Sequence, residues 1–193
     1  WAQSPGPQEN KERTELIGPS GDWFWKELKR AGITREQCDI QNAVRCFPAD
    51  YQREEWPPLK MRSPNKEEIK CCSFFTNKAI EISTARVHLI FGAVAHKAVL
   101  GQEYKKNRKV FYSERLRGTV FCLDHPSYFL RSGFGGKGQN NAPTDRLKIF
   151  RRLLVQAAEV DGVLRGGVRC AGRERRRQPH RVLGVHQVKE IGA

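Results

Sequence analysis

Apolar positions along this chain fall into short continuous runs and into longer stripes at helical spacing. Residues 87–92 (VHLIFG) and 119–123 (TVFCL) are short and rich in β-branched and aromatic side chains, a pattern typical of buried strands. A run at 38–44 predicts another short strand, and residues 110–112 predict a weak one. Residues 1–2 precede the turn-rich stretch SPGPQ and are interpreted as the end of a further strand.

Apolar residues spaced three to four apart predict helices between these strands. The first begins near the GPSG stretch at 18–21 and ends at Gly32. The second begins at Asn65, which is a favourable N-cap residue. Two further helices are predicted at 93–100 and at 143–160.

The alternation of strands and helices predicts an α/β fold, a three-layer α/β/α sandwich with a central, mostly parallel four-stranded sheet. Residues 48–65, rich in proline and charge, predict a long surface loop. In parallel sheets ligands bind outside the carboxyl ends of the strands. We therefore expect the loops at 3–9, 42–46, 92–94 and 125–129 to gather at one edge.

Charge separates the chain into two parts. It has 193 residues and a formal net charge of +14. A single domain at 1–160 contains the periodic pattern, whereas 161–193 is dense in arginine and predicts a flexible basic tail, or else an out-of-frame or otherwise anomalous terminus. A basic surface favours polyanions, with nucleic acid the commonest partner, and a solvated surface without a partner is the alternative.

Targeting signals and cysteine content indicate the cellular compartment in which the protein is expected. No apolar run approaches the roughly 18 residues of a membrane helix, and no signal peptide is recognisable, so we expect a cytoplasmic, intracellular protein of prokaryotic or phage-like type. The chain begins with Trp1, which leaves an upstream segment open. Without a secretory context the cysteines predict no disulfides. They are Cys38, Cys46, Cys71, Cys72, Cys122 and Cys170.

A histidine follows the carboxyl end of the 119–123 run, in the stretch DHPSYFLR. His125 is titratable and sits where such folds place their chemistry. An ordinary turn histidine is the alternative interpretation.

Six short motifs follow one another along residues 2–160. In order, they resemble motifs of the uracil-DNA glycosylase superfamily, most closely its family-four, iron–sulfur branch. The loop AQSPG with Glu9 three residues later is similar to the family's Gly-Glu-Ala-Pro-Gly loop and its glutamate. The other five are ELIGPSG, QNAVRCFP, PNKEEIKCC, VHLIFGAVAHKAVLG and HPSYFLR.

This resemblance implies a monofunctional DNA repair hydrolase of base excision repair. Such an enzyme cleaves the N-glycosidic bond of uracil in single- or double-stranded DNA, leaves an abasic site, and acts as a monomer without a membrane. The implied catalytic residues are His125, donating a hydrogen bond to the leaving uracil, with Glu9 and Ser4 around the attacking water. The implied base-binding residues are Gln3, Asn42 and Leu16.

Three of the base-binding positions carry alternatives. The Asn42 carboxamide matches O4 and N3–H of uracil, although a plain turn asparagine is the other interpretation. Gln3 replaces the family's glutamate, and Leu16 replaces the phenylalanine that stacks on the base. Leu16 is equally interpretable as a core residue.

DNA contacts are implied at the end of the HPSYFLR motif and beyond. Phe129 and Leu130 would form a wedge that fills the space left by the flipped base, with one of the pair expected in the core. Ser127, Arg131 and Lys137 would contact phosphates, and the tail arginines would add salt-sensitive affinity.

Cys46 and Cys72 resemble two of the four ligands of the family's [4Fe–4S] cluster, with Cys71 as the neighbouring candidate. The segment between them is longer than the family's, and the family's other pair lies upstream of the first loop, where this chain begins. The chain is therefore either part of a cluster protein or holds these cysteines as buried thiols. Two alternative functions remain, a catalytically inactive DNA-binding module of the same fold and a glycosylase for another deaminated base such as hypoxanthine.

Overall fold

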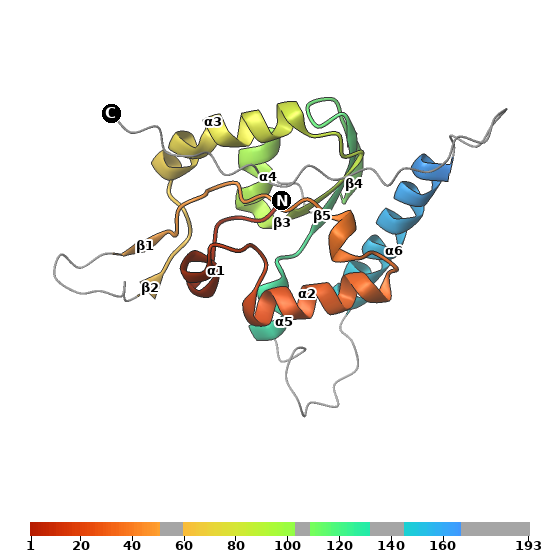
Figure 1. The fold of residues 1–193 in the computed structure, drawn as a ribbon, viewed down its shortest axis with the longest axis horizontal. Helices are drawn as coiled ribbons and strands as arrows, with labels where there is room; N and C mark the ends of the chain where they lie inside the picture. Colours follow the sequence, from red (N-terminus) through yellow and green to blue (C-terminus); the bar gives the residue numbers. More distant parts are fainter. Residues whose placement is uncertain (51–59, 103–108, 132–144, 167–193) are drawn as a thin grey trace.

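The computed structural model describes residues 1–50, 60–102, 109–131 and 145–166 (Figure 1). The first half contains α1 (Pro7–Glu12), α2 (Gly18–Arg30), the 3-10 turn η1 (Arg35–Gln37), β1 (Ala49–Asp50), β2 (Lys60–Met61) and α3 (Lys66–Ile82). The second half contains β3 (Val87–Phe91), α4 (Gly92–Leu100), β4 (Val110–Ser113), β5 (Gly118–Leu123), α5 (Pro126–Arg131) and α6 (Asp145–Gly166). The elements alternate as in an α/β fold.

The central sheet has three described strands in the order β3-β5-β4. β3 and β5 are parallel, with Phe91 opposite Leu123, whereas β4 is antiparallel to β5, with Ser113 opposite Gly118. The prediction of a mostly parallel, four-stranded sheet is therefore wrong for the described residues. The short connection from Ser113 to Gly118 explains part of the difference, because so tight a turn joins only antiparallel neighbours.

The first residues of the chain lie beside β3 without forming a full strand. The Phe91 amide donates to the Trp1 carbonyl at 2.9 Å. Ala2 pairs in parallel with Asn42 as an isolated bridge, and the Ala43 amide donates to the Ala2 carbonyl at 2.9 Å. The strand predicted at 38–44 is thus reduced to this bridge. The segment around Asn42 still runs parallel to the first residues of the protein.

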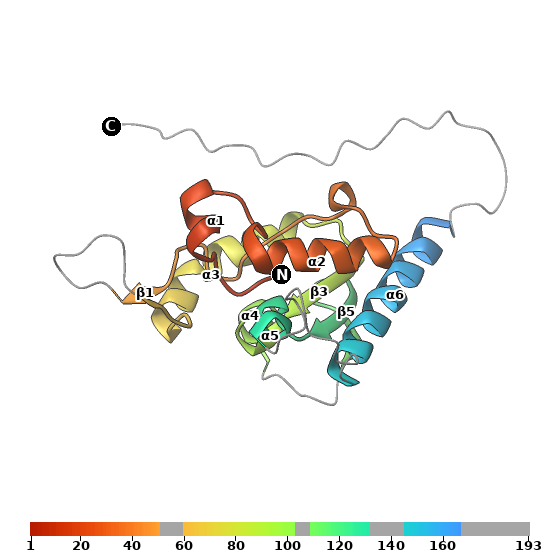
Figure 2. The same cartoon turned by 90° about the horizontal axis from the view of Figure 1, so that it is seen from below.

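Helices cover both faces of the sheet (Figure 1). Alternate β5 residues enter two apolar clusters, as expected for side chains that point to opposite faces of a strand. Phe121 and Leu123 join the cluster formed with α2, α5 and α6, whereas Val120 and Cys122 join the cluster formed with α3 and α4. Figure 2, turned by 90°, shows α2 running above β3 and β5, with α6 beside β5.

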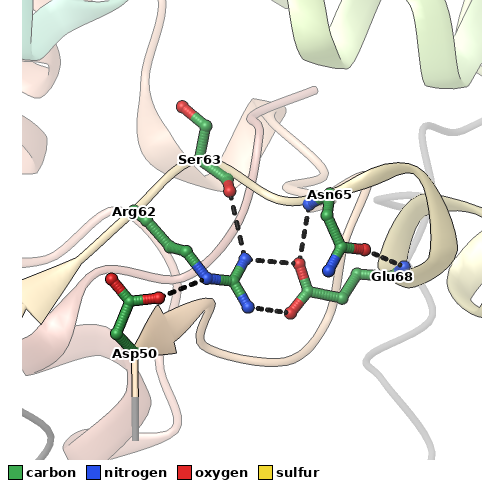
Figure 3. Close-up of polar contacts among 5 residues, drawn as sticks. All are labelled: Asp50, Arg62, Ser63, Asn65 and Glu68. Carbon is green, nitrogen blue, oxygen red and sulfur yellow. Dashed lines mark hydrogen bonds and ion pairs between the residues drawn. The ribbon is translucent and has the colours of Figure 1, made fainter.

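The segment predicted as a loop at 48–65 contains a short hairpin, in which Ala49 of β1 pairs with Met61 of β2. Figure 3 shows how its base is held: Arg62 donates to Asp50 at 3.0 Å and to both carboxylate oxygens of Glu68 at 2.9 Å. Glu68 also accepts from the amide of Asn65, whose side chain caps α3 as predicted. The hairpin is therefore fixed to the first turn of α3.

Two further observations concern α6. Arg151 donates to both oxygens of the buried Glu27 of α2, at 2.7 and 2.9 Å, and so joins the two helices. The helix continues to Gly166, six residues into the segment assigned to the tail, while residues 167–193 lie outside the described part. Among the described helices, none has the length and apolar character needed to cross a membrane.

Candidate functional site

The register of the sheet brings the predicted loops to one edge. Ala2 pairs with Asn42, the preceding Trp1 accepts a hydrogen bond from Phe91 of β3, and Phe91 lies opposite Leu123 of β5. The residues that follow each of these segments leave the sheet at the same end. Gly92 confirms this closeness, because a Cβ placed on it would lie 4.0 Å from the Cβ of His125.

His125 is held by the residue two positions after it. The backbone amide of Ser127 donates to Nδ1 of the imidazole at 3.2 Å, and the Ser127 hydroxyl lies 2.8 Å from the same nitrogen. Because an amide N–H can only donate, Nδ1 must be an acceptor, and the proton of the neutral ring resides on Nε2. Within the described residues, Nε2 has no hydrogen-bond partner.

The pKa of His125 is lowered from its ordinary value of 6.5. The main cause is burial, which disfavours the charged imidazolium, and the second is the positive charge of Arg131. The site thus presents an N–H donor that carries no net charge at neutral pH.

Ser4 is the clearest polar anomaly at this edge. Its side chain is only 6% exposed, and its hydroxyl has no hydrogen-bond partner in the described residues. A buried hydroxyl without a partner typically destabilises a protein by about 1–3 kcal/mol. Such a group at a sheet edge is well suited to bind a water or a substrate atom.

Glu9 stands in the first turn of α1 and closes the loop that contains Ser4. Its Oε2 accepts a short hydrogen bond from the backbone amide of Gly6, the residue before α1. A side chain at Gly6 would crowd this carboxylate, since a Cβ there would lie 3.2 Å from Oε2. The contact seen for Glu9 is therefore one that shapes the loop, and it occupies one of the two carboxylate oxygens.

Asn42 and Gln3 lie together at the same edge. The amide of Val44 donates to the Gln3 carbonyl at 2.9 Å, two residues beyond the Asn42 bridge. Both side chains are half-buried, and the Asn42 carboxamide has no hydrogen-bond partner among the described residues. An amide of this kind can still donate and accept toward a ligand.

Leu16 is buried, with 6% of its surface exposed, and it belongs to the apolar cluster that contains Ala2 and Phe91. Its backbone has a φ of 50°, in the left-handed region. The core interpretation of Leu16 is consistent with this burial, and the cluster that contains Leu16 extends to Ala2, which precedes the Gln3–Ser4 loop.

Phe129 does not occupy the place expected of a wedge. Its side chain is 0% exposed and stacks on Trp23 with ring centroids 4.9 Å apart, while Phe150 of α6 contacts its edge at the same distance. The prediction of Phe129 as a DNA wedge is therefore wrong for this structure. Leu130 is half-buried and is the member of the pair that reaches the surface.

The predicted phosphate contacts gather around Ser127. Arg131 is exposed and donates to the Ser127 hydroxyl at 3.0 Å. Lys137 lies outside the described residues. Sequence reasoning missed Arg146, whose guanidinium stacks over the Tyr128 ring at 4.6 Å and forms an ion pair with Asp124 at 3.5 Å. The sequence holds no signal for this contact, because it depends on how α6 packs against the loop.

Cys46 and Cys72 are adjacent in space. Burial raises the pKa of the Cys46 thiol, and the neighbouring Cys72 adds to the effect by charge and by a hydrogen bond. The Arg45 amide donates to the sulfur of the buried Cys72 at 3.4 Å, whereas Cys46 and Cys71 are both exposed. These two thiols match half of a four-thiolate set. In the described part of the chain, no three His, Cys, Asp or Glu side chains lie close enough together to hold a metal.

Comparison with known proteins agrees with this geometry. Residues 1–153 match the model of the uracil DNA glycosylase superfamily. The chain is 30% identical over 133 residues to the type-4 uracil-DNA glycosylase of Thermotoga maritima, covering 67% of this chain and 64% of that protein. It is 25% identical over 138 residues to that of Pyrobaculum aerophilum (67% and 65%) and 26% identical over 112 residues to that of Sulfurisphaera tokodaii (56% and 46%). The chain thus spans less than two thirds of each of these relatives.

Proposed function

We propose, from the premise that this chain belongs to the uracil DNA glycosylase superfamily, that it hydrolyses the N-glycosidic bond of uracil in DNA and leaves an abasic site. The observation that carries the proposal is the state of His125. Its Nδ1 is occupied by the Ser127 amide, so Nε2–H is free to donate at the edge that also holds Asn42 and Ser4.

The leaving base explains why a neutral donor is suitable. When the bond between the sugar C1′ and uracil N1 breaks, its electron pair moves into the base and negative charge accumulates on O2. A fixed N–H donor stabilises that charge more in the transition state than in the bound substrate. The half-buried imidazole of His125, with its pKa lowered, would supply this donor as an uncharged ring that keeps its Nε2 proton.

The sugar side of the reaction needs a nucleophile and a counter-charge. The C1′ centre becomes oxocarbenium-like, and a water then adds to it and releases a proton. We assign the water to the buried hydroxyl of Ser4, whose unpartnered oxygen supports the role. Glu9 would stabilise the cationic sugar through the carboxylate that also closes the loop at Gly6.

Recognition of uracil is assigned to the same edge. The Asn42 carboxamide would donate to O4 and accept from N3–H, a pattern that cytosine reverses. Leu16 would form an apolar wall of the pocket, and the backbone around Gln3 would contact the base. Gln3 carries no charge. Any function of the family's glutamate that requires a negative charge must therefore be supplied by another residue.

DNA would be held next to α5. Leu130, half-buried at the surface, is assigned the wedge that fills the vacated stack. Ser127 and Arg131 would contact the phosphates that flank the flipped nucleotide, and Lys137, outside the described residues, is assigned a phosphate contact from the sequence alone.

A single-turnover assay tests the proposal. The protein is incubated with an oligonucleotide that contains one uracil, and abasic sites are then cleaved with alkali. Cleavage at the uracil, its loss in Asn42→Asp and His125→Ala, and no cleavage of the matched cytosine strand are the expected results. Salt-sensitive DNA binding without cleavage would instead favour the inactive binding module, and cleavage at hypoxanthine alone would favour another base.

Cys46 and Cys72 are proposed as two ligands of an iron–sulfur cluster, supported by their adjacency and by the names of the relatives. The bidentate contact of Arg62 with Glu68 is consistent with this pairing, because it holds the segment after β2 against the first turn of α3, the helix that contains Cys72. Such a cluster would have a structural role, and no step above passes through it. Iron content and a broad visible absorption in full-length protein, both lost in Cys72→Ser, are expected; a colourless protein without iron would contradict the assignment.

A further inference from the structure

Leu16 is held in a backbone conformation that leucine rarely adopts. Its φ of 50° lies in the left-handed region, and its side chain is nonetheless buried. For a residue with a Cβ, this conformation typically costs about 1–2 kcal/mol, and it persists only when the surroundings impose it. Buried strain of this kind is more frequent at ligand sites than in ordinary cores.

The restraint comes from Trp25 of α2 and Arg35 of η1. The Trp25 indole N–H donates to the Leu16 carbonyl at 2.8 Å. Arg35 places its guanidinium 4.8 Å from the centre of the Trp25 ring and donates to the Glu15 carbonyl at 3.3 Å. Two side chains that contact each other therefore hold the two successive carbonyls at 15 and 16.

A glycine completes the arrangement. Gly21 packs so closely that a Cβ on it would lie 2.0 Å from the Leu16 carbonyl oxygen, which no side chain could tolerate. The Leu16 carbonyl is thus fixed from two sides, by the indole N–H and by the bare backbone of Gly21. With its carbonyl fixed, the Leu16 side chain is directed into the cluster that contains Ala2, the residue directly before the Gln3–Ser4 loop.

We propose that Trp25 and Arg35 are positioning residues for the base pocket, which act by holding Leu16 in its left-handed conformation so that its side chain forms a fixed wall for the flipped base. This inference rests on the proposed function, since it takes the pocket to bind uracil. The inference explains why Arg35, Trp25 and Gly21 surround the backbone of Leu16. A core residue in an unstrained conformation would not need these contacts. The inference also implies that the shape of the pocket contributes to base specificity, because a leucine side chain packs against a base without stacking on it.

The test is a titration of free uracil, followed by NMR, into the full chain and its variants. Trp25→Phe keeps a ring for Arg35 and removes only the indole N–H, so it should weaken uracil binding roughly 5-fold, as expected for one lost hydrogen bond. Arg35→Lys keeps the charge and removes the flat stacking group, so a smaller loss in the same direction is expected. Both variants should raise KM for uracil-containing DNA more than they lower kcat.

Trp23→Phe is the matched control. Trp23 lies on the same helix and is buried, but it stacks on Phe129 and belongs to the core. This variant should lower the melting temperature and leave the affinity for uracil unchanged. An equal loss of affinity in Trp23→Phe and Trp25→Phe would show a merely structural role and overturn the inference.

The titration also separates the inference from the proposed function. A wild-type chain that binds uracil but does not excise it would refute the glycosylase activity, and the loss of binding in Trp25→Phe would still support the positioning role. Unchanged binding in Trp25→Phe would overturn the positioning role even if the wild type excises uracil. A wild type that excises uracil but does not bind free uracil would overturn the positioning role and leave the glycosylase activity standing.

Discussion

Replacing Ser127 with alanine removes one of the two groups that orient His125. The hydroxyl lies 2.8 Å from Nδ1 of His125 and accepts from Arg131 at 3.0 Å, so the substitution also releases the arginine. The backbone amide of residue 127 still donates to Nδ1, at 3.2 Å in the wild type. The Nε2–H tautomer should therefore persist, but with a less firmly held ring.

The size of the effect follows from this partial loss. A neutral hydrogen bond contributes about 1 kcal/mol net, and about 1.4 kcal/mol corresponds to a tenfold change in rate. We expect Ser127→Ala to slow uracil excision roughly 5-fold in single-turnover conditions. His125→Ala removes the donor itself and should slow excision by about 10²- to 10³-fold.

Ser73→Ala provides the matched control, because Ser73 is exposed and its hydroxyl, among the described residues, donates to the Lys70 carbonyl of its own helix alone. It should excise uracil at the wild-type rate. If Ser127→Ala were as slow as His125→Ala, the hydroxyl would have a direct role in the reaction. If it were as fast as Ser73→Ala, the positioning argument would be refuted.

Three further predictions concern stability, pH and recognition. Arg151→Met removes the bidentate partner of the buried Glu27 carboxylate but leaves its ion pair with Arg30, so it should reduce the free energy of unfolding in urea by about 2 kcal/mol, whereas the exposed Arg152→Met should leave it nearly unchanged. Because burial lowers the pKa of His125, the neutral ring persists below pH 6.5. The excision rate should therefore stay constant through neutral pH and fall only in more acidic buffer. A rate that rises on acidification would contradict the role of a neutral donor. Asn42→Asp cannot donate to O4 of uracil, and undiminished excision by this variant would refute the role of Asn42.

Much of the fold follows from local patterns that the sequence states directly. The apolar stripes predict α2 and α4 closely, and Asn65 caps α3 as its residue type suggests. The gathering of loops at one edge was also predictable, because parallel neighbours end together. These features depend on residues that are close in the sequence or on general rules of sheet geometry.

The errors have a different origin. Phe129 follows an exposed-looking turn, and only the packing of Trp23 and Phe150 from two other helices makes it a core residue. The hairpin at 48–65 depends on the contact of Arg62 with Glu68 on the next helix. Both outcomes are set by contacts between elements, which periodicity along the chain does not describe.

The side chains that hold the backbone of Leu16 could not be predicted, for the same reason. Trp25, Arg35 and Gly21 have ordinary positions in the sequence, and their common target is a pair of backbone carbonyls. Backbone atoms carry no sequence signal, so only the structure brings these residues together.

The excision assay on a single-uracil oligonucleotide tests the central claim most directly. The account predicts alkali-dependent cleavage at the uracil by the wild-type chain, and a loss of about 10²-fold or more in His125→Ala. An inactive wild type, or a His125→Ala variant as active as the wild type, would contradict it.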